Sequence, residues 1–367
     1  MRGIKDIPLQ AAGNQDLAAL PSGGRVLVIR LRSLGDTVLM TPALRMLHDW
    51  RPDLEISVLL ERPWDQLLEG NPSVHKVLTA ESKFGTAWRV RRAGYHAVLN
   101  LHGGPTSAWL TRISGARLRA GFAHFRSGSA YTHRVPTAQQ ILGRQGAVHT
   151  AEHVASCLFW LGVPEGTIPP SEIYSSVAAR ERVAERLRSF GIGAGEGYAV
   201  IHPTALYDTK QWKAAGFAEA CEYMEERHGL RSVFICAETE VRALDSIERH
   251  SSRPLLRAAG WPIRDLVALM AGARVMVGND SGPAHIAAAA HIPVVVIFGS
   301  SHSAVWSPWK AVESAVVQNF FDCNPCAGDR CYAFAEPRCI LSITTEQVKV
   351  CIDAVLQSQT RRPTIMR

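Results

Sequence analysis

A short segment between two apolar runs constrains the fold of this chain more than any other feature. The segment is Asn279–His285, it contains Gly282 and Pro283, and apolar runs precede it at 274–278 and follow it at 292–298. This order is typical of strand, tight loop, helix and strand in a parallel sheet, with the loop at the carboxyl end of the first strand. Because backbone N–H groups at a helix start favour anions, the segment predicts a diphosphate-binding site.

Apolar runs of strand length recur along the chain and alternate with helical periodicity. The first half has them at 25–29, 54–60 and 96–101, and the pattern restarts at 198–201 and 232–236. Such alternation is typical of a parallel sheet covered by helices on both faces. We therefore expect an α/β fold with two doubly wound, Rossmann-like sheets.

With 367 residues, the chain is too long for one ordinary core and suits two domains. The glycine-rich segment Gly191–Gly197 predicts a hinge, and because it precedes a strand it does not fit a dinucleotide-binding loop. Two such halves joined by a hinge describe the GT-B architecture, with the ligand in a central cleft. The expected division is a loose leader at 1–22, an N-terminal domain at 23–190, a C-terminal domain at 191–345, and a helix and tail at 346–367 that could pack back on the N-terminal domain.

Composition narrows the class of protein and of partner. A chain with 47% hydrophobic and 20% charged residues is typical of a globular protein. No apolar run is long enough to span a bilayer, and the first twenty residues lack a signal-peptide pattern, so we expect a cytoplasmic location. The net charge of +7 favours an anionic partner. Because no RNA-binding signature or zinc finger is present, nucleic acid is not the expected partner.

A polar turn follows the first strand. Ser33 and Gly35 allow the chain to turn, and Asp36 then comes at the start of the next helix. A carboxylate at that place is a candidate general base facing a cleft. An aspartate at a helix start also serves as an N-cap without any further role, so the residues alone leave both interpretations open.

Polar residues also follow the strands of the second half. Thr204, Thr209 and Lys210 come after the strand at 198–201, and Glu240 comes after the next strand. Lys210 could neutralise a phosphate, and Glu240 could bind a ribose. Taken singly, each is also an ordinary surface residue.

Two further patterns permit more than one interpretation. His149 to His153 formally matches the H-x-x-E-H motif of zinc proteases, but no third ligand is evident and a helix is the favoured interpretation. Near the end of the chain lie four cysteines within seventeen residues. They could be structural thiols, they could bind zinc or an iron–sulfur cluster, or they could form disulfides. A cytoplasmic location disfavours disulfides. These four are Cys323, Cys326, Cys331 and Cys339.

Four motifs occur together in one order and spacing. They are Ser-Leu-Gly-Asp at 33–36, His-Gly-Gly at 102–104, Lys-x-Trp at 210–212, and Asp-Ser-Gly-Pro-x-His at 280–285 before an alanine run. Together they resemble the ADP-heptose:lipopolysaccharide heptosyltransferases of glycosyltransferase family 9, and the resemblance covers roughly residues 25–355. The combination is far more specific than any single motif.

This resemblance implies an inverting, metal-independent transfer of heptose from ADP-heptose to a sugar hydroxyl of the lipopolysaccharide inner core, either Kdo or heptose. Asp36 matches the general base and Lys210 the lysine that contacts the donor phosphates. Glu240 matches the acid that holds the adenosine ribose, with Glu238 as a competing choice. No cofactor is expected.

The resemblance also assigns binding residues. The expected donor-binding residues are Thr204, Lys210, Glu240, Asp280, Ser281, Gly282, Pro283 and His285. The expected acceptor-binding residues are Ser33, Gly35 and His102 of these motifs. To them we add Arg62, Arg91, Arg92 and Arg112, basic residues of the first half that could meet the phosphates and carboxylates of the acceptor. The expected partners are ADP-heptose and a lipid-anchored lipopolysaccharide core, with peripheral association at the cytoplasmic face of the inner membrane. The alternatives are a related transferase that uses another nucleotide sugar and a catalytically silent protein that binds nucleotide sugars or lipids.

Overall fold

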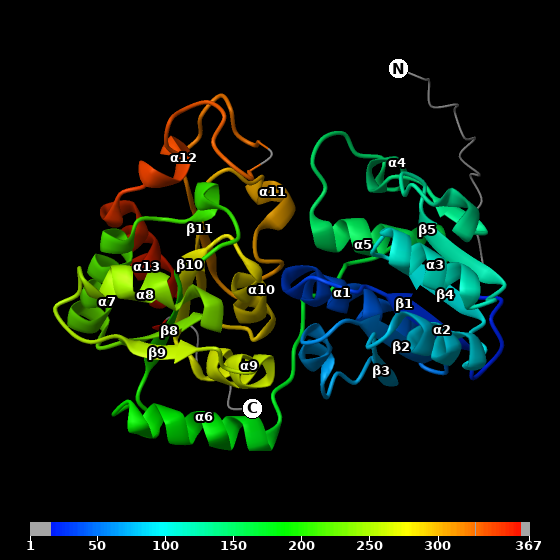
Figure 1. Ribbon diagram of the computed structural model, residues 1–367, viewed down its shortest axis with the longest axis horizontal. Coiled ribbons are helices and arrows are strands. Elements are labelled where there is room, and N and C mark those ends of the chain that lie inside the picture. Colours follow the sequence, from blue (N-terminus) through cyan, green and yellow to red (C-terminus); the bar gives the residue numbers. More distant parts are fainter. Residues whose placement is uncertain (1–15, 327, 361–367) are drawn as a thin grey trace. The chain divides into compact units, whose positions relative to one another are not determined.

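The computed structural model describes residues 16–326 and 328–360, which divide into two compact units. Each unit contains one six-stranded, fully parallel sheet with helices packed on it (Figure 1). The first unit comprises the chain up to Leu31, Pro42–Glu61 and Ser73–Pro169, and the second comprises Arg32–Thr41, Arg62–Pro72 and the chain from Pro170 onward.

The first sheet has the strand order β3-β2-β1-β4-β5-β6. Its centre is apolar, because Val28 of β1 pairs in register with Val58 of β2 and with Leu99 of β4. The strands are β1 (Arg25–Ile29), β2 (Glu55–Leu60), β3 (Lys76–Thr79), β4 (Ala97–Asn100), β5 (Leu118–Phe122) and β6 (His133–Val135). The helices before Pro170 are α1 (Leu34–Trp50), η1 (Trp64–Leu68), α2 (Lys83–Arg92), α3 (Pro105–Ile113), η2 (Gly128–Ala130), α4 (Ala138–Leu142) and α5 (Thr150–Trp160).

The second sheet has the strand order β12-β11-β10-β7-β8-β9. Its strands are β7 (Tyr198–His202), β8 (Arg231–Cys236), β9 (Leu256–Ala259), β10 (Val275–Asn279), β11 (Val294–Phe298) and β12 (Ser314–Gln318). The helices after Pro170 are α6 (Val177–Ser189), η3 (Asp208–Lys210), α7 (Ala214–His228), η4 (Glu238–Glu240), α8 (Val241–Glu248), α9 (Ile263–Gly272), α10 (Gly282–Ala289), α11 (Ser303–Trp306), α12 (Arg338–Leu341) and α13 (Thr345–Thr360).

Buried strands in the middle of the second sheet contribute to two cores. Val200 and Met276 belong to the core that includes α9 and α10, whereas their neighbours Ile201 and Val277 belong to the core that includes α7 and α13. Successive side chains of a strand point to opposite faces, so a continuous apolar run fills both cores. This explains why these strands were evident as unbroken apolar runs in the sequence.

Helix α6 belongs to the second unit, which differs from the expected boundary at residue 190. Its Val183 and Leu187 are buried in the core shared with α9. Arg182 and Arg186 also form ion pairs with Asp265 of α9, whose side chain is only 1% exposed, at 2.6 and 3.2 Å. The glycine-rich segment expected as an interdomain hinge therefore lies inside the second unit, between α6 and β7.

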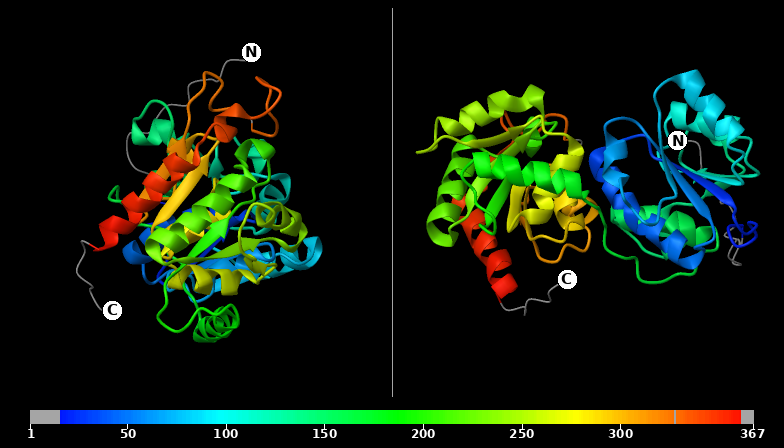
Figure 2. Two further views of the ribbon diagram at one scale, coloured as in Figure 1. Left: turned by 90° about the vertical axis from the view of Figure 1, so that its left-hand side faces the viewer. Right: turned by 90° about the horizontal axis from the view of Figure 1, so that it is seen from below.

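The two ends of the described chain also differ from expectation. Leu17, placed in a loose leader, is fully buried, and its N–H donates to Leu161 O at 3.2 Å. The preceding residues 1–15 lie outside the described part. Helix α13 packs on α7, β11 and β12 of the second unit, along whose strands it runs in Figure 2. Its Val348 and Ile352 are buried in that core.

Among the described residues, none of the helices combines the length and the apolar character needed to cross a membrane.

Candidate functional site

The site is built at the carboxyl edge of the second sheet. Strands β11, β10, β7 and β8 are neighbours there. From β7 the chain continues to β8 and β9 on one side, and it later forms β10, β11 and β12 on the other side of β7. Such a switch point leaves room for a ligand outside the strand ends. The polar residues that follow these strands therefore lie close together.

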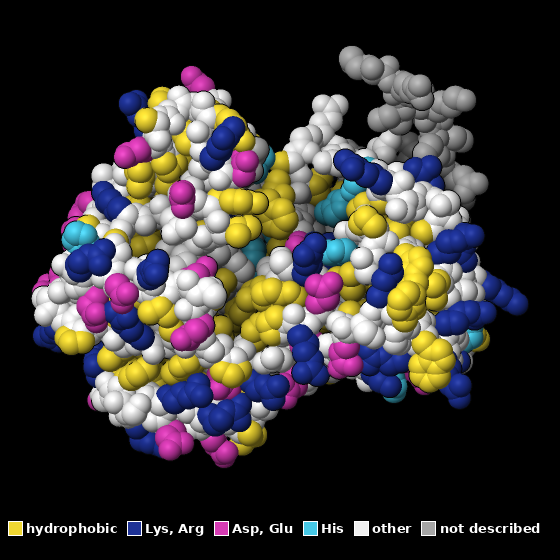
Figure 3. All heavy atoms as spheres, in the orientation of Figure 1, with side chains coloured by type: hydrophobic (Ala, Val, Ile, Leu, Met, Phe, Trp, Pro, Cys, Tyr) yellow, Lys and Arg dark blue, Asp and Glu magenta, His cyan; other side chains and the backbone are white. Residues whose placement is uncertain are grey.

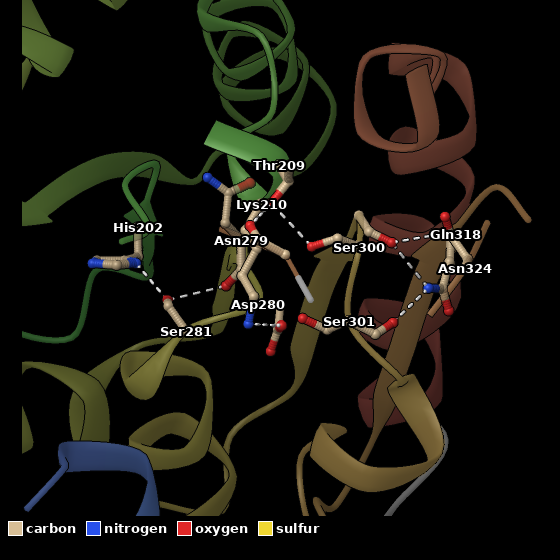
Figure 4. A network of polar contacts seen from close by, with 12 residues as sticks. His202, Thr209, Lys210, Asn279, Asp280, Ser281, Ser300, Ser301, Gln318 and Asn324 are labelled. Carbon is tan, nitrogen blue, oxygen red and sulfur yellow. Dashed lines mark hydrogen bonds and ion pairs between the residues drawn. The ribbon is translucent and has the colours of Figure 1, made fainter. Parts of the chain in front are cut away.

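Lys210 and Asp280 form an ion pair at this edge. Lys210 Nζ lies 2.9 Å from Asp280 Oδ2, and the aspartate side chain is only 6% exposed (Figure 4). The backbone N–H of Asp280 donates to Ile297 O on the neighbouring strand, which fixes the backbone at this residue. Asp280 therefore holds the ammonium group of Lys210, whose side chain is 24% exposed, at the end of β10.

His202, the last residue of β7, connects three polar side chains. Its Nδ1 lies 2.8 Å from Ser281 Oγ, and its Nε2 lies 3.2 Å from Thr204 Oγ1. Thr204 Oγ1 in turn donates to Glu240 Oε2 at 2.9 Å. Burial lowers the pKa of His202 to about 4, although the Glu240 carboxylate opposes this shift. The imidazole is therefore neutral at pH 7, and its two nitrogens link Thr204, which follows β7, to Ser281, which follows β10.

The structure separates the two candidate glutamates. Glu240 accepts hydrogen bonds from Thr204 Oγ1 and from the backbone N–H of Ala237, both at 2.9 Å. Glu238 is exposed, and its carboxylate lies over Gly260 at the end of β9. Only Glu240 belongs to the hydrogen-bonded group that contains His202.

Helix α10 starts at the same edge. Ser281 is its N-cap, Gly282 and Pro283 open its first turn, and His285 is buried within it. The helix is buried from Pro283 to Ala289, which its alanines permit because they let the backbone approach the sheet closely. The first-turn N–H groups of a helix have no intrahelical acceptor and therefore suit an anionic ligand.

A second layer of polar side chains holds the loop that carries Lys210. Buried Asn279 donates from Nδ2 to Pro203 O at 2.8 Å and accepts from Trp212 N at 3.1 Å. Ser300 Oγ donates to Thr209 Oγ1 at 3.0 Å. Figure 4 shows these residues from β10 and from the segment after β11 converging on the 209–210 segment.

Sequence reasoning assigned no role to several residues of this layer. Gln318 Nε2 donates to Ser301 O at 3.0 Å, and Asn324 Nδ2 donates to Gly299 O at 2.8 Å. The available signal was weak, because Gln318 is the last residue of a short strand and Asn324 lies in the loop after it. Their partners lie far away in the sequence, so only the fold reveals them.

The candidate base lies at the start of α1. Ser33 Oγ donates to Asp36 Oδ2 at 3.0 Å, and Thr37 Oγ1 donates to Ser33 O at 2.7 Å. Because α1 begins at Leu34, Asp36 is in the first turn and is not the N-cap residue. Gly35, also predicted here, belongs to the same turn.

His102 lies on a firmly held loop at the carboxyl end of β4. Buried Asn100 accepts through Oδ1 from the N–H groups of His102 and Gly103, and its Nδ2 donates to Tyr131 Oη at 3.0 Å. Asp36 follows β1 and His102 follows β4, which are adjacent parallel strands. Both residues therefore lie in segments that follow the carboxyl end of a strand, and these two strands are neighbours in the first sheet.

Three of the other predicted acceptor residues, Arg91, Arg92 and Arg112, are not brought to this edge. Arg91 and Arg92 end α2, and the chain then enters β4 at its amino end. Arg112 occupies the last turn of α3, which likewise runs back toward the amino edge. In a parallel sheet with crossover helices, helix ends lie at the edge opposite the strand ends, so these arginines are remote from His102. Arg62, by contrast, comes two residues after the carboxyl end of β2, in the segment 62–72 that groups with the second unit.

The H-x-x-E-H match is a helix-capping arrangement. His149 is the N-cap of α5 and accepts from Ala151 N at 3.1 Å, while Glu152 accepts from His149 N at 3.2 Å. His153 stacks on Phe122 with ring centroids 4.1 Å apart. Burial lowers the pKa of His153 to about 4. These contacts account for the motif without a metal.

The four clustered cysteines line one cavity of about 190 Å³, together with Thr209 and Ser300. All four are free thiols. Burial, followed by the nearby thiols, raises the pKa of Cys339. Within the described ranges, which omit residue 327, no group of three or more histidine, cysteine or acidic side chains is arranged to hold a metal ion.

Comparison with known proteins agrees with the fold and the motifs. The family description "Glycosyltransferase family 9 (heptosyltransferase)" matches residues 86–333. Lipopolysaccharide heptosyltransferase 3 of Escherichia coli is 28% identical over 300 residues, which cover 76% of this chain and 85% of that protein. Lipopolysaccharide heptosyltransferase 1 of Pseudomonas aeruginosa is 25% identical over 327 residues, covering 84% and 87%.

Solved structures show the same fold. A family 9 glycosyl transferase from Veillonella parvula aligns with a TM-score of 0.78 at 20% identity, covering 92% of this chain and 99% of that one. The E. coli ADP-heptose lipopolysaccharide heptosyltransferase II aligns with a TM-score of 0.77 at 18% identity and the same coverage. The expected α/β fold with two Rossmann-like GT-B units is thus confirmed, and the chain belongs to glycosyltransferase family 9 and is a glycosyltransferase.

Proposed function

We propose that this enzyme transfers heptose from ADP-heptose to a sugar hydroxyl of the lipopolysaccharide inner core, Kdo or heptose, with inversion and without a metal. The observation that carries the proposal is the group of donor-site residues at one sheet edge: Lys210 with Asp280, and His202 with Thr204 and Glu240. The relatives named above act on lipopolysaccharide, which supports this choice of acceptor.

The second unit suits the nucleotide. Lys210 and the N–H groups at the start of α10 would stabilise the negative charge that develops on the β-phosphate as ADP departs. Glu240, already oriented by Thr204, would accept hydrogen bonds from the ribose hydroxyls. Ser281, Gly282, Pro283 and His285 form the segment on which the diphosphate would lie. Lys210 and these N–H groups would supply the positive potential that a leaving diphosphate requires.

Asp36 would act as the general base. It would accept the proton of the acceptor hydroxyl while that oxygen attacks the anomeric carbon, and the bond from this carbon to the phosphate oxygen would break with its electron pair leaving on ADP. Attack opposite the leaving group inverts the anomeric configuration, so a single carboxylate suffices. Ser33, which donates to Asp36 Oδ2, would orient the carboxylate.

The acceptor would approach the residues that follow the first strands. Ser33, Gly35, Arg62 and His102 remain proposed acceptor-binding residues. Because the core sugars are anchored in a lipid, we also propose that the enzyme works at the cytoplasmic face of the inner membrane. Arg91, Arg92 and Arg112 end helices that run toward the other edge of the first sheet, so we propose that they do not contact the reacting sugar.

The deciding experiment measures ADP release from ADP-heptose in EDTA, with and without a heptose-deficient core lipid. Acceptor-dependent release by the native enzyme is expected, and it should fall by about 10²–10⁴-fold in Asp36→Asn without loss of ADP binding. Asp49→Asn, which changes an exposed aspartate of the same helix, is the matched control. Normal turnover by Asp36→Asn would refute its role as the base. ADP binding without any release would indicate another donor sugar or acceptor.

A further inference from the structure

Helix α2 exposes two large aromatic side chains on its outer face. Phe84 is 77% and Trp88 is 61% exposed, and the two lie one helical turn apart. The opposite face of the helix, with Thr86, Ala87 and Val90, is already buried in the first unit. The aromatic pair is therefore not required for packing α2 onto its own sheet, and Figure 3 shows the apolar patch over this helix with basic side chains around it.

The surroundings of this patch are cationic. Helix α2 contains four basic residues and no acidic residue. Among the described residues, Lys83, Arg91, Arg92 and Arg112 form no ion pair with a carboxylate, whereas Arg89 donates to Thr79 O. The uncompensated positive charge adjoins an exposed apolar surface, a combination that fits an anionic apolar partner.

The cations and the rings are in direct contact. The Arg92 guanidinium lies 5.4 Å from the centre of the Trp88 ring, and Lys83 Nζ lies 5.2 Å from the Trp109 ring of α3. Phe84 meets Trp109 edge to face, with ring centroids 6.3 Å apart. Aromatic rings with adjacent cations suit the boundary between acyl chains and lipid headgroups, where rings bury their apolar bodies and cations meet phosphates.

We propose that the outer face of α2, with Trp109 of α3, docks on an anionic phospholipid bilayer. This inference rests on the proposed lipid-anchored acceptor and deepens it by naming the membrane-contacting surface. The bilayer fits better than a second copy of the chain, because a two-fold interface would place this cationic patch against itself. The residues of the docking surface are Lys83, Phe84, Trp88, Arg91, Arg92 and Trp109.

The test measures co-sedimentation of the full chain with vesicles, in the absence of any donor. Vesicles of phosphatidylcholine alone are compared with vesicles that also contain phosphatidylglycerol, at low and high salt. Binding to the anionic vesicles and its loss at high salt are expected. Equal binding to both compositions, or no binding to either, would overturn the proposal.

Two pairs of substitutions locate the surface. Phe84→Ser with Trp88→Ser should lower the partition coefficient for anionic vesicles at least tenfold. Lys83→Gln with Arg92→Gln should lower it by about thirtyfold. The matched controls lie in the second unit. Phe320→Ser removes a ring that is 79% exposed, and Arg242→Gln with Arg249→Gln removes one exposed charge within α8 and one directly after it. Controls that weaken binding as strongly as the α2 variants would refute this location.

Activity separates docking from catalysis. The variant with Phe84→Ser and Trp88→Ser should release ADP at the native rate with a water-soluble core acceptor and more slowly with a vesicle-embedded one. If the native chain binds anionic vesicles but transfers no heptose, the proposed function fails and the docking surface stands. If these two substitutions change the oligomeric state and leave vesicle binding unchanged, the patch is a protein interface and the docking proposal fails.

Discussion

At the scale of single residues, the candidate donor site depends on buried polar groups that satisfy one another. Asp280 is nearly inaccessible and has Lys210 as its cation, while His202 is buried between Ser281 and Thr204. A buried polar or charged group without its partner is costly, so these contacts stabilise the fold as well as position the site.

Replacement of Lys210 by methionine should separate these two contributions. Lys210→Met leaves the Asp280 carboxylate without its cation, and we expect the free energy of unfolding to fall by about 1–3 kcal/mol. Adding Asp280→Asn should restore part of this loss, yet ADP affinity should remain at least tenfold weaker in both variants. Urea unfolding and ADP titration measure the two effects, with Lys213→Met, an exposed neighbour, as the control. A double variant no more stable than Lys210→Met would contradict the coupling.

The buried His202 should make stability depend on pH. Burial lowers its pKa from 6.5 to about 4, so between these values the unfolded chain binds a proton that the folded chain excludes. The free energy of unfolding should therefore fall as pH drops from 6.5 toward 4. In His202→Asn this slope should be shallower by up to about 1.4 kcal/mol per pH unit. Urea unfolding at several pH values tests this, and exposed His250→Asn should keep the native slope.

At the scale of elements, the site depends on loops that other loops hold in place. The segment with Thr209 and Lys210 is linked through Ser300 and through Asn279 to the ends of β11 and β10. Gly299 lies directly against this segment, because a Cβ atom built there would collide with Thr209 O. The absence of a side chain at Gly299 thus allows the two loops to meet.

Gly299→Ala should therefore displace the lysine loop. The new methyl group would push Thr209 away, and we expect ADP binding to weaken about tenfold and the free energy of unfolding to fall by about 1–3 kcal/mol. Gly166→Ala is the control, since a Cβ atom there would meet nothing within 4 Å. Calorimetric titration with ADP measures the first effect. Unaltered affinity in Gly299→Ala would show that the loop tolerates the displacement.

At the scale of the whole molecule, the candidate functions are divided between two units with similar sheets. His202, Lys210, Glu240 and Asp280 of the candidate donor site all belong to the second unit, whereas His102, a proposed acceptor-binding residue, belongs to the first. Each unit has its own core, so a ligand of one unit should stabilise that unit first.

Hydrogen exchange with ADP alone should reveal this division. We expect slower amide exchange in the segments at 202–212 and 279–285, where donor contacts would suppress local opening, and no change in the loop at 102–104. The measurement is mass spectrometry of peptides with and without saturating ADP. Equal protection of both units would mean that ADP does not bind the second unit alone.

The sequence by itself determined the local elements and the motifs. Strands β1, β10 and β11 were predicted within two residues, because each is a continuous run that can be buried on both faces. The turns after them were evident from glycine, proline and polar residues, whose backbone preferences are local. Short strands such as β6 and β12, with little buried surface, gave no comparable signal.

Only the tertiary structure decided which distant residues meet. It placed α6 on α9 through Asp265, selected Glu240 over Glu238 as the partner of Thr204, and joined Asn279 to the loop before Trp212. It also placed Arg91 and Arg92 at the sheet edge away from His102, where the charge pattern alone had suggested acceptor binding. Pairings of this kind depend on which strand ends are neighbours in the sheet, and strand order is fixed by long-range packing that no local pattern of residues contains.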